Sequence, residues 1–157
     1  MNSELKQEYT RRITSANKSE LIVIMFEMYH QYSVDAIVAC DEERYSDMHL
    51  EIRRARSVVS ALIGALDMSY ELSANLYGIY RFVERDIISA DIKRNKDGLE
   101  EALRLMDKLM ESFREMAKAD VDAPMIQNAE AIYAGMTYGR GSVMEMSNAG
   151  SNRGFFA

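Results

Sequence analysis

The chain has 157 residues, a length that suits one domain with a substantial hydrophobic core. Apolar residues make up 48% of it, which argues against intrinsic disorder. The net charge of −6 lacks the basic surplus of a nucleic-acid binder, so we expect no nucleic-acid partner.

Cysteine use and hydropathy bear on where the protein works. Cys40 is the only cysteine, which excludes an intramolecular disulfide and is compatible with a reducing compartment. Residues 1–12 carry no apolar run of the signal-peptide kind, and the longest apolar stretch, Leu21 to Phe26, is far too short to span a membrane. We therefore expect a cytoplasmic protein that is not inserted into a membrane.

The first two predicted helices follow each other closely. One begins near Asn17, where Asn17 and Glu20 have the spacing of a capping box. Its apolar stripe is Leu21, Met25, Met28, Tyr32, Ala36 and Ala39. The next begins near Ser46 as N-cap. Its stripe is Ile52, Ala55, Val59, Leu62 and Leu66.

Two further helices are predicted in the same way. The third carries the stripe Leu72, Leu76, Ile79, Val83, Ile87 and Ala90. The fourth is capped by Asp97 with Glu100. Its stripe is Leu99, Leu103, Met106, Met110, Phe113 and Ala117. Short connections force antiparallel neighbours, so residues 1–119 are predicted to form an all-α, antiparallel up-down four-helix bundle.

The composition changes after Ala119. Residues 120–157 contain the only proline and five of the eight glycines. Within this C-terminal extension, 124–134 is predicted as a short helix, because Pro124 suits a first turn and Gly135 a C-terminal cap. From Gly139 onward we expect a flexible tail.

Few residues suggest chemistry. Glu27 and His30 match half of a di-iron Glu-x-x-His motif, but Ser46 stands where the second glutamate would precede His49. No histidine base is specified for Cys40, and there is no glycine-rich phosphate loop. We expect no catalytic residues, no metal and no cofactor.

The unusual feature is surplus apolar surface. The first helix carries Ile22, Phe26, Tyr29 and Ile37 besides its stripe, and the third carries Tyr77, Tyr80 and Ile88. One interpretation is packing at the rim, covered by the N-terminal segment or the tail. The other is a groove for helices of another protein, which the twelve methionines favour because they repack around varied partners.

Three segments resemble the flagellin export chaperone family (FliS): Asn17 to Glu27, Ser60 to Asp67, and Asn75 to Phe82 followed by Arg85 and Ala90. The third resembles that family's Asn-Leu-Tyr signature with a second tyrosine three residues on. Departures are Asn17-Lys18 in place of Ser-Pro, Met28 in place of a common glycine, and Ala90-Asp91 in place of Ala-Asn.

The resemblance implies a cytoplasmic chaperone that binds the disordered C-terminal segment of flagellin. That segment would fold as helices on the bundle, which blocks premature polymerisation and keeps flagellin competent for the flagellar export apparatus. The residues expected to bind this client are Ile22, Phe26, Tyr29, Val58, Leu62, Ile63, Tyr77, Tyr80 and Ile88. An adaptor of the same fold for another client, or a paralogue whose groove its own tail fills, stays open as an alternative.

Overall fold

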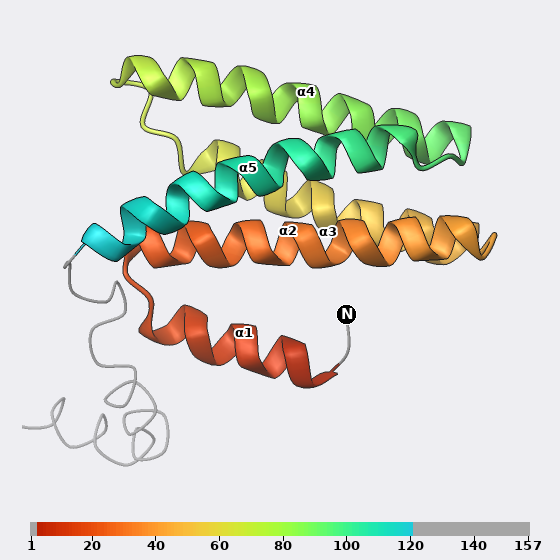
Figure 1. Ribbon diagram of the computed structural model, residues 1–157, viewed down its shortest axis with the longest axis horizontal. Helices are drawn as coiled ribbons and strands as arrows, with labels where there is room; N and C mark the ends of the chain where they lie inside the picture. Colours follow the sequence, from red (N-terminus) through yellow and green to blue (C-terminus); the bar gives the residue numbers. More distant parts are fainter. Residues whose placement is uncertain (1–2, 121–157) are drawn as a thin grey trace, which may run out of the picture.

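Five helices make up the regular structure of residues 3–120, the part of the chain that the computed structural model describes. They are α1 (Ser3–Ser15), α2 (Lys18–Asp41), α3 (Tyr45–Gly64), α4 (Glu71–Lys93) and α5 (Asp97–Ala119). Helices α2 to α5 run up and down as an antiparallel bundle, which confirms the predicted fold class (Figure 1). The predicted helix at 124–134 and the tail lie outside the described residues.

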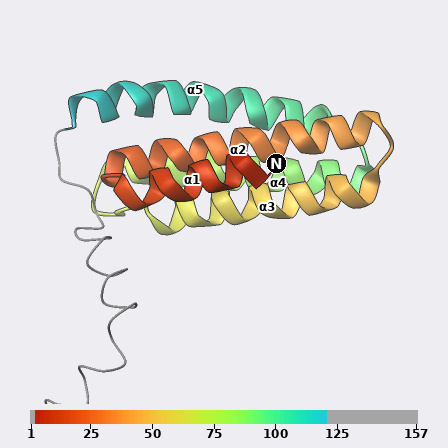
Figure 2. The ribbon, with the colours of Figure 1, turned by 90° about the horizontal axis from the view of Figure 1, so that it is seen from below.

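The four long helices form a closed ring in which each contacts two neighbours: α2 with α3, α3 with α4, α4 with α5, and α5 with α2. The remaining helix, α1, was not predicted. It packs against α2 outside the ring, as both views show (Figure 2). Helix α2 therefore has packing partners on three sides.

Of three predicted N-caps, the structure confirms the one at α2, whereas the N-caps of α3 and α5 each lie before the residue that was predicted. At α2 the capping box is present: the Asn17 side chain accepts a hydrogen bond from the Glu20 backbone N–H at 2.8 Å, and the Glu20 carboxylate accepts one from the Asn17 N–H at 2.9 Å. Helix α3 instead has Arg44 as N-cap and α5 has Lys96, neither with a side-chain cap. The predicted caps Ser46 and Asp97 lie within the first turns of these helices.

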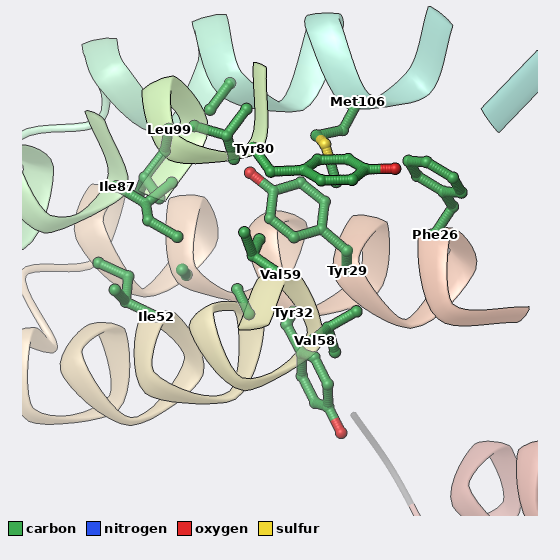
Figure 3. Packing of buried hydrophobic residues seen from close by; sticks show 14 of the residues in the cluster. Phe26, Tyr29, Tyr32, Ile52, Val58, Val59, Tyr80, Ile87, Leu99 and Met106 are labelled. Atoms are coloured by element: carbon green, nitrogen blue, oxygen red, sulfur yellow. The ribbon is translucent and has the colours of Figure 1, made fainter. Parts of the chain in front are cut away.

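The centre of the bundle is aromatic. Figure 3 shows the rings of Tyr29 and Tyr80 next to each other, with Phe26 beyond them. The centroids of Phe26 and Tyr80 are 6.4 Å apart, so α2 and α4 meet across the core although they are not neighbours in the ring. Burial raises the pKa of Tyr80 to about 12.

Two hydroxyls deep in this core are poorly satisfied. The side chains of Tyr29 and Ser33 are fully buried, and among the described residues neither hydroxyl has a hydrogen-bond partner of ordinary geometry. Burial raises the pKa of Tyr29, and the nearby Ser33 hydroxyl opposes this rise only in part. The pair is a local cost within an otherwise apolar core.

The sequence misplaced the buried face of α2. Phe26 and Tyr29, expected outside the core stripe, are fully buried, whereas Met25 and Met28 of the predicted stripe are only half-buried. The reason is that α2 packs against α1, α3 and α5 together, so its burial follows the geometry of three partners and not one stripe. Tyr80, also expected at the flank, belongs to the core.

Candidate functional site

Helix α1 covers part of the apolar surface of α2. Its inward residues are Leu5, Tyr9 and Ile13, which recur every four positions and so share one face, and Ala16 in the link to α2 is buried with them. They pack against Leu21, Ile24 and Met28 of α2. This contact shows that an N-terminal segment covers apolar residues of α2. None of them is one of the surplus residues named from the sequence, so the choice between the two interpretations of that surplus stays open.

An ionic contact reinforces the docking of α1. The Arg12 Nη1 donates to Glu27 Oε2 at 2.6 Å, and the Arg114 Nη2 of α5 donates to Glu27 Oε1 at 3.0 Å. Burial would raise the pKa of Glu27, but the hydrogen bonds from both guanidinium groups together hold it below its ordinary value. Glu27 thus joins α1, α2 and α5 through one carboxylate.

Glu27 and His30, which match half of a di-iron motif, both contact side chains of other helices. Glu27 binds the two arginines, and the Nδ1 of His30 lies 2.8 Å from Asp107 Oδ1 of α5. Among residues 3–120, no three His, Cys, Asp or Glu side chains are grouped closely enough to hold a metal ion. These residues act between helices in this structure.

A shallow apolar hollow of about 270 Å³ lies between α2 and α3. It is lined by Met25, Met28, Tyr32, Arg54, Ser57, Val58 and Ala61. The Arg54 guanidinium carbon lies 6.0 Å from the centroid of the Tyr32 ring and forms its polar rim. Met28 belongs both to this hollow and to the surface on which α1 docks, so the two are continuous.

Along the edge between α3 and α4, polar contacts between the two helices repeat at a regular spacing. Two polar contacts join the helices: His49 Nδ1 lies 2.7 Å from Asp91 Oδ2, and Arg56 forms an ion pair with Glu84 at 3.8 Å. This spacing is seven residues along both antiparallel helices. Seven residues further along both helices stand Ile63 and Tyr77. Ile63 is half-buried, and Tyr77 is 43% exposed. The position that follows these polar contacts, near the start of α4, is therefore apolar on both helices.

The nine residues expected to bind a client do not form one surface. Five are buried in the core: Phe26, Tyr29, Val58, Leu62 and Tyr80. Ile22, Ile63 and Ile88 are half-buried, and Tyr77 is exposed. Val58 lines the hollow, whereas Ile63 and Tyr77 do not. Their role in binding stays a prediction.

Sequence reasoning missed most of the hollow. Met25 and Met28 were assigned to the core stripe, and Ala61 was not among the expected client-binding residues. Tyr32, also assigned to that stripe, is buried in the core and lines the hollow as well. For α1 a signal was present, since Leu5, Tyr9 and Ile13 recur every four residues. For the hollow no comparable signal exists, because its lining depends on how α2 and α3 are rotated about their axes.

No helix in the described part of the chain combines the length and the apolarity that crossing a membrane requires.

The chain was also compared with known proteins. A search of curated proteins found no match. The family described as "Flagellar protein FliS" matches residues 1–120, which take in all five helices. Because this match covers well over half of the chain, the protein belongs to the FliS family of flagellar export chaperones.

Proposed function

We propose that this chain is a cytoplasmic, flagellin-specific export chaperone. It binds the C-terminal helical segment of flagellin, prevents premature polymerisation and delivers an export-competent subunit to the flagellar export apparatus. The family membership supports a flagellar chaperone in general. The single structural observation that supports a helical client is the apolar hollow between α2 and α3, which is open at the surface of the bundle.

The hollow suits one face of an amphipathic helix. Such a helix places residues spaced three and four apart into an apolar groove, and its polar side remains in water. The unbranched side chains of Met25 and Met28 adjust to the shape of the entering residues. A disordered client loses part of the interaction energy in becoming ordered, so binding needs this apolar contact.

The hollow is tested with Ala61→Lys and a peptide of the flagellin C-terminal segment. Ala61 is exposed at the rim, so a longer side chain blocks the hollow without removing core atoms. Lysine is chosen because Arg54 would pair with a new carboxylate but repels a new ammonium group. The matched control is Ala74→Lys, at an exposed position of α4.

Calorimetry should show affinity weakened about tenfold or more by Ala61→Lys, since a charge would have to be desolvated, and unchanged by Ala74→Lys. Equal affinity in all three proteins would place the client elsewhere. In that case Tyr77→Ala, which should weaken binding with little loss of stability, tests the α3–α4 edge. If the wild-type protein does not bind the flagellin peptide but binds another flagellar protein, the alternative of an adaptor for a different client is favoured.

A further inference from the structure

Helices α4 and α5 are close at one end and apart at the other. Where α5 begins, a Cβ built on Gly98 would lie 2.8 Å from the Asp86 carbonyl oxygen of α4, so the two backbones are in tight contact. Toward the start of α4 and the end of α5 the two helices diverge (Figure 1). The consequence is visible in the exposure of residues at the diverging ends.

On α4 the uncovered residue is Leu72. It lies four residues before Leu76 and therefore points in the same direction as the core face of the helix. Leu76 is 8% exposed, but Leu72 is 60% exposed. The apolar stripe of α4 thus extends one turn beyond the helices that bury it.

On α5 the corresponding residue is Met116. Arg114 and Asp107 both pair with α2, and Met116 lies about 200° around the helix from Arg114. Because α2 and α4 are the main neighbours of α5 among the described helices, this places Met116 on the edge that faces α4. Met116 is nevertheless 58% exposed. Leu72 on the core side of α4 and Met116 on the α4-facing edge of α5 are thus both exposed at the end of the bundle where these two helices diverge.

The end of the described chain lies at the same end of the bundle. Helix α5 ends at Ala119, and the next residue, Asp120, accepts a hydrogen bond from the Ser19 hydroxyl at the start of α2. The start of α2, the end of α3, the start of α4 and the end of α5 share this end (Figure 1). Whatever follows Asp120 is therefore tethered beside the diverging ends of α4 and α5.

We propose that residues 124–134 of the same chain, outside the described part, form a helix that packs where α4 and α5 diverge. The link from Asp120 to Pro124 spans at most about 14 Å, which keeps the segment near this end of the bundle. As a helix it would gather its large apolar residues within roughly 120° of its circumference. These are Met125, Ile126, Ile132 and Tyr133. Gln127 falls on the opposite side.

Covalent trapping tests the placement in the full chain. In a Cys40→Ser background, Leu72→Cys is combined with Ile132→Cys, and the rate of disulfide formation under mild oxidation is measured. The matched control combines Leu72→Cys with Gln127→Cys, on the polar side of the segment. The first pair should form an intramolecular disulfide faster, because docking brings Ile132→Cys close to Leu72→Cys. The difference should be about three- to tenfold and not larger, because a short helix of this length is only marginally stable before it docks. Equal rates in the two pairs would overturn the proposal.

A second measurement needs no disulfide between the two segments. The thiol introduced by Leu72→Cys is labelled with a maleimide, with and without Ile132→Asp. Ile132→Asp should speed labelling several-fold, whereas Gln127→Asp should leave the rate unchanged. If all three rates agree, the segment does not cover Leu72. Disulfide-linked dimers, or protection that appears only after a flagellin peptide is added, would assign this site to a second copy or to the client and refute this placement. Neither result bears on whether flagellin is bound.

Discussion

Replacement of Gly98 by alanine tests the close approach of α4 and α5. The new Cβ would lie 2.8 Å from the Asp86 carbonyl oxygen, where ordinary contact begins near 3.4 Å, so the helices must separate by about half an ångström. Overpacking of this kind costs about 1–3 kcal/mol. The greater helix propensity of alanine returns up to about 1 kcal/mol. We expect a net loss of roughly 1–2 kcal/mol, which is a fall of about 3–8 °C in Tm for a domain of this size.

The matched control is Gly78→Ala. Gly78 is an exposed position inside α4, and no atom lies within 4 Å of a Cβ built there. This variant should gain about 0.5–1 kcal/mol, because alanine is the better helix former. Both variants are compared with the wild type by thermal and urea unfolding followed by circular dichroism. A Gly98→Ala protein as stable as Gly78→Ala would show that α4 and α5 do not touch at this point.

Three further substitutions probe the interior and the docking of α1. Tyr29→Phe should leave stability unchanged or raise it by up to about 1 kcal/mol, since it removes a buried hydroxyl without a good partner; a clear loss in urea unfolding would reveal one. Leu76→Ala should cost about 2–5 kcal/mol, and a cost below about 1 kcal/mol would remove Leu76 from the core. Glu27→Gln should destabilise the protein at pH 7. Because the pKa of Glu27 is lower folded than unfolded, its stabilisation is complete above the ordinary value of 4.5 and is lost as the pH falls below it, so the two urea midpoints should converge in acid. A gap that persists there would mean that charge is not the cause.

The four long helices were predictable because their apolar residues recur at helical spacing and their connections are short. Helix α1 was missed because Leu5, Tyr9 and Ile13 are its only large apolar residues in a polar segment. Such a helix is stable only when docked, and docking depends on a surface formed by distant residues.

The binding residues were harder to predict than the fold. Helix α2 opens with the unbroken apolar run from Leu21 to Phe26, so periodicity does not determine which side faces the core. The choice between Tyr29 and Met28 as the buried residue depends on where α1, α3 and α5 lie around α2. For the same reason the hollow combines residues of a predicted core stripe with Ala61, which no pattern singles out.

The enclosure of α2 by three helices has a consequence for hydrogen exchange. Amide protons of α2 have no edge of the bundle through which a small opening could release them, so they should exchange only when the whole domain unfolds. Amide protons of α1, which packs mainly on α2 with few contacts, should exchange through a local event of much lower free energy. Adjacent segments of one chain, on either side of Ala16, would thus report two different equilibria: undocking of α1 and global unfolding.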